Sequence, residues 1–432
     1  MLSIAPLVLS VRIQRICEFS FLAAVFVLPF AKAGFEILFG LALFFWILGK
    51  IVGRASFRLD LAILIVLGIF ILSSLVSAFG SGYPEISFRG MIKLLKYVFV
   101  MLVAADLFTD DNSAKRLLVI GLLGFSLVLL DSLAQNIWGR ELIFNYPIRY
   151  ATEQIRLTGP YQSYGLLAAH TIVFIPILVA FIARSGSNLK KIGWGALLLT
   201  ACYILYRTQS RGAWLAALGS LVAYGLLSRH KWFLVVLVVV TLAAPFTLPK
   251  QILFHRDILN QEQSLVERKL LWNRAISVIK ARPWFGCGIG TYTKNYPKYT
   301  QGEKWSLIGE RAIQSGYTHE KESWRIPGHP NQIPGYYVHN GYLQLAAETG
   351  LVSLGFFLIV LGMSFCSGFQ ALKRVEKNRK PLITGLICGL VALLLQAFVD
   401  TTLNGLQSAV FVWLGLGLLI AVKNIKANEQ NA

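Results

Sequence analysis

Long apolar runs recur along almost the whole chain, and they restrict the fold more than any other feature of the sequence. A run of about 17 to 25 apolar residues is the length that crosses the hydrocarbon core of a bilayer. The tenth run below is long enough to tilt or to begin outside the bilayer, and the seventh is short. We therefore expect an all-α polytopic membrane protein with about twelve transmembrane helices. The twelve runs are 16–33, 34–52, 59–80, 90–108, 116–136, 161–183, 192–206, 212–228, 232–249, 340–371, 382–400 and 404–422.

Composition supports this fold class. Of the 432 residues, 56% are hydrophobic and only 14% are charged, whereas about 25% of the residues in an average soluble domain are charged. Residues 19–33, which end in Ala31-Lys32-Ala33, resemble a secretory signal with a cleavage site. A second apolar run follows at once, so we expect an uncleaved first span.

The net charge of +20 would suit a nucleic-acid partner, but the positions of the charges indicate membrane topology instead. With a cytoplasmic N-terminus, nineteen Lys or Arg residues fall in short segments on the cytoplasmic side and seven on the outward side. This positive-inside bias predicts that both termini are cytoplasmic. We expect no nucleic-acid binding. The cytoplasmic set is Arg12, Arg15, Lys50, Arg54, Arg58, Lys115, Arg116, Arg184, Lys190, Lys191, Arg229, Lys231, Lys373, Arg374, Lys377, Arg379, Lys380, Lys423 and Lys426.

Two longer segments interrupt the short connections on the outward side, at about 137–160 and 250–338. The chain accordingly divides into spans one to nine at 1–249, an outward loop at 250–338, and the last three spans with a cytoplasmic C-terminus at 339–432. In the loop, SLVERKLLWNRAISVIKARPW has helical spacing of its apolar residues, and Arg282-Pro283 ends that helix. The following GCGIGTYTKNYPKY predicts turns, and the polar stretch from Glu303 to Lys321 is a candidate for a further short helix.

Basic side chains gather at the outward interface, against the topological bias. Arg207 ends the seventh run, Arg211 begins the eighth, Arg149 and Arg156 precede the sixth, and Arg89 lies at the outward end of the fourth. A guanidinium group stays charged and donates two hydrogen bonds at once, so these residues suit a phosphate or diphosphate carried by a lipid. Snorkelling toward headgroups is the alternative. Either explanation fits Arg89, Arg149 and Arg156 singly, whereas Arg211 favours function because it lies in a five-residue turn.

Lys93 and Lys96 lie deeper in the fourth run than the arginines. Ionisable side chains at membrane depth are costly. These two lysines therefore either line a cavity or pair with a buried acid such as Asp106.

His339 and Asn340 stand at the outward end of the tenth run. Asn340 is a suitable helix N-cap, and the partial positive charge of a helix N-terminus keeps an imidazole ring neutral. A neutral ring can accept a proton as a general base, and the same helix end attracts phosphate. Glu348, nine residues on, is expected to face roughly the opposite side. An interfacial histidine that hydrogen-bonds locally fits the position equally well.

The sequence predicts neither a metal site nor a nucleotide site. His319 and His329 are ten residues apart in the outward loop, without metal-ligand spacing. The glycines of GCGIG at 286–290 lack the strand-to-helix context of a nucleotide fingerprint, and no Walker-type loop is present. His170 is expected to be a buried polar residue inside the sixth run.

The order of these motifs resembles that of the bacterial O-antigen ligase and O-antigen polymerase superfamily, which also includes protein O-oligosaccharyltransferases. The ligase motif is His, then Asn, Ser or Gln, nine residues, Gly, two residues, and Gly, Thr or Tyr. Here His339 and Asn340 are followed by nine residues to Gly350, and Ser353 occupies the last position. TQSRGAW resembles the outward arginine motif, LWNRAISVIKARPWFGCGIGTY a loop segment, and TGPYQSYGLLAAH the entry to the sixth span. The likeness extends to the architecture, a GT-C-like glycosyltransferase with a large periplasmic loop before its last three spans.

The resemblance implies an inverting, metal-independent glycosyltransferase of the bacterial inner membrane that needs no cofactor. Its donor would be O-antigen on undecaprenyl diphosphate, and its acceptor a hydroxyl group of the lipid A–core oligosaccharide. By position in the motifs, His339 would be the catalytic base and Arg211 would bind the donor diphosphate. Further residues for binding the diphosphate or other parts of the substrates are hypothesised: Arg207, Arg149, Arg156, Arg89 and Asn340.

Three other functions are considered. An O-antigen polymerase would join two lipid-linked repeats, and the match to the ligase motif favours the ligase over it. A protein O-oligosaccharyltransferase usually has additional loop or C-terminal sequence, which is not evident here. A transporter or lipid flippase also suits twelve spans with intramembrane charges, but the large loop is unrepeated and the polar residues gather at one face.

Overall fold

The computed structural model describes residues 4–53, 59–151, 154–247, 258–295, 298 and 337–424. The chain forms two compact units. Unit 1 comprises residues 1–68, 93–255 and 357–432, and unit 2 comprises residues 69–92 and 256–356. Three long helices contribute residues to both units: α3 (Leu61–Phe79), α4 (Pro84–Leu107) and α14 (Gly341–Arg374).

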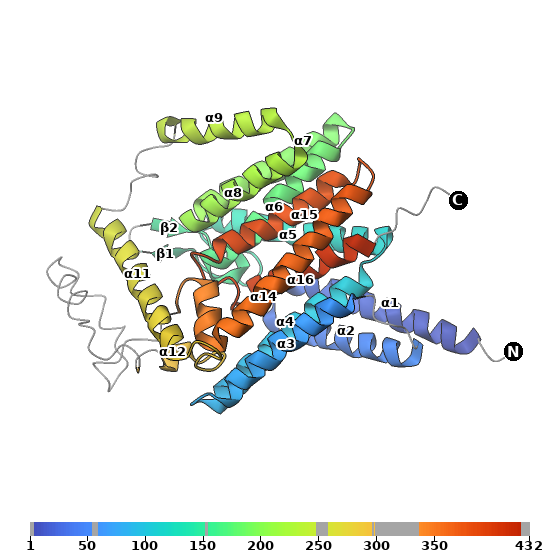
Figure 1. The fold of residues 1–432 in the computed structure, drawn as a ribbon. Coiled ribbons are helices and arrows are strands. Elements are labelled where there is room, and N and C mark those ends of the chain that lie inside the picture. The colour runs from blue at the N-terminus through green and yellow to red at the C-terminus, as the bar shows by residue number, and fades with distance from the viewer. Residues whose placement is uncertain are drawn as a thin grey trace. The chain divides into compact units, whose positions relative to one another are not determined.

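Each of the twelve apolar runs contains a helix (Figure 1). Six of these helices, namely α2, α3, α5, α6, α14 and α16, are long and apolar enough to cross a membrane by length and composition. The chain is therefore a multi-pass helical membrane protein, while the number of twelve spans stays a prediction. The bounds of α3, α4 and α14 are given above. The remaining helices of the twelve runs are α1 (Ile4–Val27), α2 (Lys32–Gly53), α5 (Asp111–Trp138), α6 (Tyr164–Arg184), α7 (Asn188–Arg207), α8 (Arg211–Ser228), α9 (Lys231–Thr247), α15 (Lys380–Gln396) and α16 (Leu406–Asn424).

Short elements fill part of the two outward segments. In the first are strands β1 (Arg149–Ala151) and β2 (Gln154–Arg156) and the 3-10 turn η1 (Gly159–Tyr161). In the second are α11 (Ile258–Ala281) and α12 (Tyr292–Asn295). The amphipathic helix expected before Arg282-Pro283 is confirmed, whereas the β-hairpin has no counterpart in the sequence prediction. The short helix expected within 303–321 lies outside the described residues.

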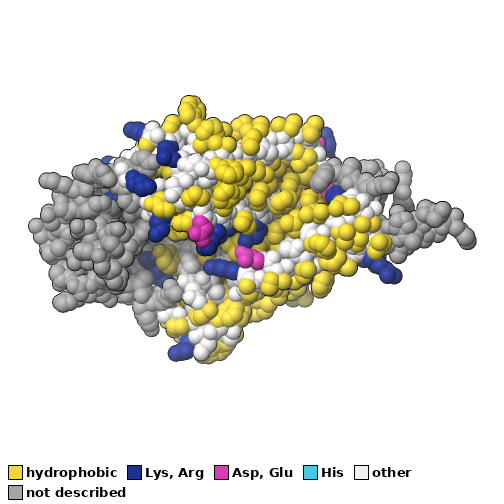
Figure 2. All heavy atoms as spheres, turned by 90° about the horizontal axis from the view of Figure 1, so that it is seen from below, with side chains coloured by type: hydrophobic (Ala, Val, Ile, Leu, Met, Phe, Trp, Pro, Cys, Tyr) yellow, Lys and Arg dark blue, Asp and Glu magenta, His cyan; other side chains and the backbone are white. Residues whose placement is uncertain are grey.

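The surface has the apolar character that lipid requires. Large hydrophobic side chains are widely exposed, among them Phe19 at 73%, Leu199 at 72% and Leu215 at 70% of their area. Figure 2 shows one face on which hydrophobic side chains cover most of the described surface. Such an area in contact with water would favour aggregation, whereas hydrocarbon solvates it.

Within unit 1, helix α15 packs against α6, α8 and α16 (Figure 1). Two glycines one helical turn apart permit the close approach to α6. A Cβ atom at Gly389 would lie 2.6 Å from the backbone oxygen of Val173, and one at Gly385 would lie 3.0 Å from that of Pro176. This small-xxx-small pattern brings helix backbones together where lipid supplies no hydrophobic driving force.

Four ion pairs in unit 1 join residues that the topology prediction assigns to the cytoplasmic side, most of them at or near helix ends. Lys50 pairs with Asp106 at 2.8 Å, Lys423 with Asp60 at 2.8 Å, Arg116 with Glu18 at 2.6 Å, and Arg379 with Asp111 at 2.5 Å. Because every pair joins two ends of the same assigned side, the packing of unit 1 agrees with strictly alternating helix directions.

Of the two alternatives for Lys93 and Lys96, a pairing with Asp106 is not what the structure shows. Asp106 accepts hydrogen bonds from Lys50 Nζ at 2.8 Å and from the Trp46 indole at 2.9 Å. Lys96 bonds instead to Glu36, at the start of α2. Ten residues of α4, about 15 Å of helix, separate Lys96 from Asp106, so the two side chains belong to opposite halves of the bundle.

Gly389→Val is expected to destabilise the protein by about 1–3 kcal/mol, because the new side chain overpacks the α15–α6 contact. Thermal unfolding of the full-length protein in detergent measures the effect. Gly195→Val in α7 is the matched control, since a Cβ atom there meets nothing within 4 Å. Equal unfolding temperatures for the two variants would contradict the close helix contact.

Candidate active site

A residue with an unusual backbone lies two positions before helix α14. His339 has a φ angle of 50°, in the left-handed region that costs a non-glycine residue roughly 1–2 kcal/mol. The side-chain oxygen of Asn340 accepts hydrogen bonds from the backbone N–H groups of Tyr342 and Leu343 at 3.1 and 3.0 Å. The predicted Asn340 N-cap is thus confirmed. Strained residues of this kind cluster at functional sites.

A chain of buried hydrogen bonds reaches from the loop after α11 to the residue before His339. The backbone N–H of Gly290 donates to one carboxylate oxygen of Glu348 at 2.9 Å, and the Gln344 amide donates to the other at 2.8 Å. The Gln344 oxygen in turn accepts from the backbone N–H of Val338 at 3.1 Å. This network holds the backbone on the N-terminal side of His339 in place.

Gln344 is a residue that sequence reasoning missed, and Glu348 was considered only as a direct partner of His339. Both side chains are buried. Their spacing in the sequence could have indicated this contact, because polar residues four apart face each other on a helix. Polar side chains inside an apolar run are costly, so two of them on one face indicate a mutual interaction.

Gly350 divides α14 into two helical segments. Its φ and ψ angles of 85° and 170° are not helical, and a Cβ atom there would lie 2.0 Å from the backbone oxygen of Trp284. The next residue, Leu351, donates its backbone N–H to the oxygen of Pro283 at 2.7 Å. The unusual length of the tenth run therefore reflects two segments rather than one tilted helix.

The glycine-rich loop after α11 pairs with the first segment of α14. Cys287 and Gly288 donate their backbone N–H groups to the oxygens of Ala347 and Glu348, both at 3.0 Å. Gly288 has a φ angle of 114°, and a Cβ atom there would lie 2.3 Å from Ser81 Oγ. The glycines of this loop thus permit close packing within unit 2. Burial, with a contribution from the Glu348 carboxylate, raises the pKa of the Cys287 thiol to about 12, so this cysteine is no thiolate nucleophile.

Ser353, where the sequence departs from the ligase motif, is a packing position. Its side chain is fully buried. The hydroxyl oxygen lies 2.7 Å from Ser73 Oγ of α3 and donates to the backbone oxygen of Thr349 at 2.9 Å. A small hydroxyl side chain fits this contact, so the last motif position serves the α3–α14 interface of unit 2.

Unit 1 holds the arginines of the sixth to eighth runs. Arg149 and Arg156 lie opposite each other in the antiparallel β-hairpin. The following residue, Leu157, donates its N–H to the backbone oxygen of Arg207 at 3.1 Å. The buried Arg156 guanidinium lies 4.6 Å from the ring centre of Tyr164. The hairpin is thereby joined to the end of α7 and the start of α6.

The turn between α7 and α8 presents the other two arginines. The Arg207 guanidinium donates to the Tyr203 hydroxyl at 3.1 Å. Arg211 is the first residue of α8, and its side chain is exposed. A Cβ atom at the next residue, Gly212, would lie 2.5 Å from Val399 Cγ2. Arg211 thus stands at a helix N-terminus, where both its own charge and the helix dipole favour an anion.

Polar side chains of α5, which the sequence analysis did not identify, hold the backbone of the segment that contains the hairpin. The Gln135 oxygen accepts from the N–H groups of Thr158 and Gly159 at 3.0 and 2.9 Å. An Asp131 oxygen accepts from the N–H of Leu142 at 2.8 Å. Both side chains are buried. Their position in the last turns of an apolar run could have indicated that they bind backbone groups.

The structure therefore places Arg149, Arg156, Arg207 and Arg211 in unit 1, and it places the other candidates in unit 2. Those are His339, Asn340 and Arg89. Arg89 is 74% exposed and pairs with Glu85 one turn earlier in α4. His319 and His329 lie outside the described residues. Among the residues that are described, no three His, Cys, Asp or Glu side chains are grouped as metal ligands.

A comparison with protein families finds one match. The O-antigen ligase family matches residues 195–360, a region that includes the turn with Arg211, helix α11, the glycine-rich loop and the first segment of α14. The match supports membership of the chain in the O-antigen ligase and polymerase superfamily. No curated protein matches it. The superfamily resemblance inferred from the sequence is confirmed, and the matched region contains both His339 and Arg211.

Gly350→Ala should destabilise this superfamily member by about 2–4 kcal/mol, because the methyl group collides with the Trp284 backbone at a left-handed φ angle. Gly355→Ala, five residues further along α14, is the control, since its Cβ atom meets nothing within 4 Å. Thermal unfolding in detergent compares the two variants. A Gly350→Ala protein as stable as Gly355→Ala would mean that the junction with the loop is absent.

Proposed function

We propose that the protein is an inverting, metal-independent glycosyltransferase of the bacterial inner membrane. In this proposal it moves O-antigen polysaccharide from undecaprenyl diphosphate to lipid A–core oligosaccharide on the periplasmic side, with both termini cytoplasmic. The observation that supports it most is the backbone of His339. The residue directly precedes the N-cap of α14, and its strained backbone is held by neighbouring buried hydrogen bonds. It also lies inside the region that matches the O-antigen ligase family.

His339 acts as the general base in the proposed reaction. A ring nitrogen takes the proton of the acceptor hydroxyl group as that oxygen attacks the anomeric carbon of the donor. The bond from that carbon to the diphosphate oxygen breaks, and the electron pair leaves with undecaprenyl diphosphate. Attack on the face opposite the leaving group inverts the configuration. The half-buried position of His339 and the fixed start of α14 suit a base that must keep its orientation.

Arg211 binds the donor diphosphate in the proposed reaction. Its guanidinium is exposed at the N-terminus of α8, where donors and positive charge stabilise the negative charge that develops on the leaving group. Arg207, Arg149 and Arg156 belong to the same end of unit 1 and are proposed to share that charge. Arg89 and Asn340 are proposed to contact substrate from unit 2.

The main alternatives are an O-antigen polymerase and a protein O-oligosaccharyltransferase of the same superfamily. All three enzymes would transfer a glycan from a lipid diphosphate, so they differ in the acceptor. The ligase is favoured because His339, Asn340 and Gly350 follow the spacing of the ligase motif. A transporter would bind lipid-linked glycan without transferring it.

Reconstitution of the full-length protein with purified lipid-linked O-antigen tests the function, with chelator present. The wild type should form glycosylated lipid A–core, and His339→Ala should lower the rate by about 10²–10⁴-fold because the base is lost. His230→Ala, in the turn between α8 and α9, is the control and should transfer normally. Wild-type rates for His339→Ala would exclude its catalytic role.

The acceptor offered in the same system separates the alternatives. Product on lipid A–core identifies a ligase, whereas extension of a second lipid-linked donor identifies a polymerase. Transfer to neither, with lipid-linked donor moving across the bilayer, would support the transporter. Loss of transfer on addition of chelator, restored by a divalent cation, would contradict the metal-independent mechanism.

Arg211→Lys should reduce the rate of transfer at least about tenfold, because a point charge cannot replace the bidentate guanidinium fork. Arg229→Lys, at the other end of α8, is the matched control and should transfer at the wild-type rate. Rates measured at several donor concentrations report the effect on donor binding. Full activity of Arg211→Lys would remove this residue from the diphosphate site.

A further inference from the structure

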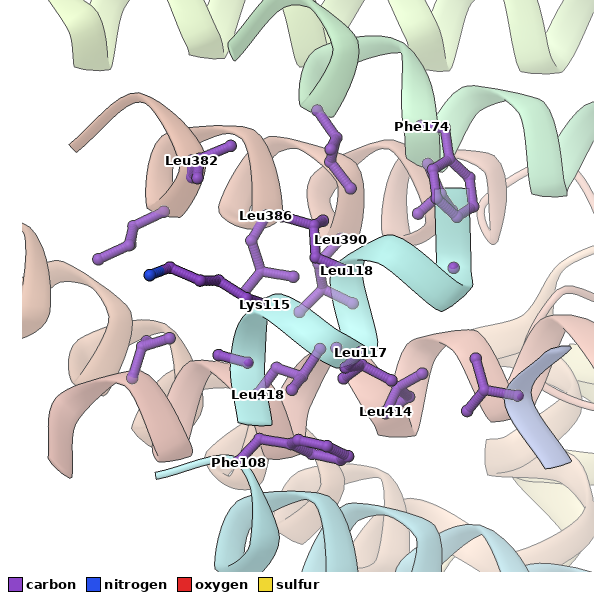
Figure 3. A pocket seen from close by; sticks show the side chains of 18 of the residues that line it. Phe108, Lys115, Leu117, Leu118, Phe174, Leu382, Leu386, Leu390, Leu414 and Leu418 are labelled. Carbon is purple, nitrogen blue, oxygen red and sulfur yellow. The ribbon is translucent and has the colours of Figure 1, made fainter. Parts of the chain in front are cut away.

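Unit 1 contains an apolar cavity of about 370 Å³ that the proposed reaction does not use. It lies among α5, α6, α15 and α16 (Figure 3). In Figure 3 the aliphatic stem of Lys115 extends among leucine side chains such as Leu386 of α15 and Leu418 of α16. The volume is within the range of about 300–1,000 Å³ that is usual for sites of small organic ligands.

The two ends of the cavity differ in character. One end is lined by aromatic rings, where His170 stacks on Phe411 at 4.7 Å and Phe125 on Phe174 at 4.3 Å between ring centres. His170 is buried there, as the sequence predicts. The other end is lined by charged side chains: Asp111, Lys115, Arg184, Glu376 and Arg379. A cavity that is apolar at one end and charged at the other is complementary to an amphiphilic ligand.

The rim has more positive than negative charge. Arg379 and Asp111 pair with each other at 2.5 Å. Glu376 is then the one remaining acid among the described lining residues, against Lys115 and Arg184. The guanidinium of Arg184 is also oriented, because its Nε donates to the Asn378 side-chain oxygen at 3.3 Å. Two exposed cations beside one acid favour an anionic group such as a phosphate.

The position of the rim separates this cavity from the proposed diphosphate site. Arg184 is the last residue of α6, whereas Tyr164, which stacks with Arg156, is the first. The twenty intervening steps span about 30 Å of helix. The rim therefore lies at the end of unit 1 that has the four ion pairs, which the topology prediction assigns to the cytoplasmic side.

We propose that this cavity binds a phospholipid, with one acyl chain in the apolar channel and the phosphate at Lys115 and Arg184. The acyl chain removes leucine and aromatic surface from contact with water or voids, and each buried methylene adds to the affinity. The cations replace the interactions that the headgroup makes at the membrane surface. The bound lipid is a structural ligand that joins α5, α6, α15 and α16, and it takes no part in glycosyl transfer.

Gly121 provides a direct way to close the cavity. It lines the channel on α5, and a Cβ atom there would lie 3.8 Å from the Phe174 ring, an ordinary contact distance. Gly121→Leu thus places a side chain in the channel, while Gly121→Ala adds one methyl group and keeps most of the volume. For the rim, Lys115→Ala removes a lining cation, and Lys191→Ala removes an exposed lysine of α7 that does not line the cavity.

The test uses purified full-length protein in detergent with dioleoylphosphatidylglycerol as the probe. Native mass spectrometry measures bound lipid, and thermal unfolding measures stabilisation. Saturating lipid should raise the unfolding midpoint of the wild type by about 5 °C. Gly121→Leu should lose both bound lipid and stabilisation, and Lys115→Ala should weaken binding about fivefold. Gly121→Ala and Lys191→Ala should bind normally, and all four variants should keep wild-type transfer.

Three comparison ligands show which part of the lipid is bound and whether another lipid binds in preference. Inorganic phosphate alone should not stabilise the protein, and dioleoylglycerol, which has the chains without the phosphate, should bind at least about fivefold more weakly. Equal binding of dioleoylglycerol would overturn the phosphate assignment. Preferential binding of undecaprenyl phosphate would overturn the proposal by making the cavity a donor site. Retention of phosphatidylglycerol by a folded Gly121→Leu protein would overturn the location.

Discussion

Hydrocarbon offers no hydrogen-bond partner to a backbone N–H or carbonyl group, so a chain inside it must pair these groups within its own segment. Helices meet this requirement over most of the described residues. The described backbone departs from helical geometry in several segments, among them 139–151 with 154–163, 208–210 and 338–340, and at the break at Gly350. Buried side chains supply partners for backbone groups there: Gln135 accepts from the N–H of Gly159, and Gln344 accepts from the N–H of Val338. The candidate functional residues other than Arg89 adjoin these departures.

The sequence predicted the features that depend on local chemistry. Apolar length located the helices, Asn340 indicated its own cap, and Arg282-Pro283 indicated the end of α11. The bias of Lys and Arg toward one side agrees with the ion pairs that join helix ends of unit 1. These features need no knowledge of which helices are neighbours, so one sequence is sufficient for them.

Features that depend on tertiary neighbours could not be predicted. Asp106 pairs with Lys50 because α2 and α4 place these ends together, and spacing along α4 alone suggested the wrong lysine. The first helix runs from Ile4 to Val27 rather than over 16–33, since Pro29 stops it early. The break at Gly350 exists because the Trp284 backbone occupies the space that a side chain would need. For Asp106 and Gly350 the partner is distant in sequence, whereas the early end of the first helix at Pro29 is a local feature that the apolar run obscured.

The spacing from His339 to Gly350 has a concrete basis in unit 2. Gly350 is held against the loop at Pro283 and Trp284, and a short helix of fixed length lies between that junction and His339. Gln344 and Glu348 lie inside this helix and connect its start to Gly290. An insertion or deletion here would rotate the histidine about the helix by about 100° per residue, so length is constrained as well as residue type.

The left-handed backbone of His339 also bears on how such a protein would lose activity in evolution. Asn accepts this conformation far more readily than most side chains do, and it differs from His here mainly in lacking an imidazole. A single His-to-Asn replacement would leave the capped helix, the loop junction and the membrane bundle intact. If His339 is the general base proposed above, the resulting chain would still be made and inserted, and only its chemistry would be missing. Inactive descendants of such an enzyme would therefore be recognised by this one position rather than by any decay of the fold.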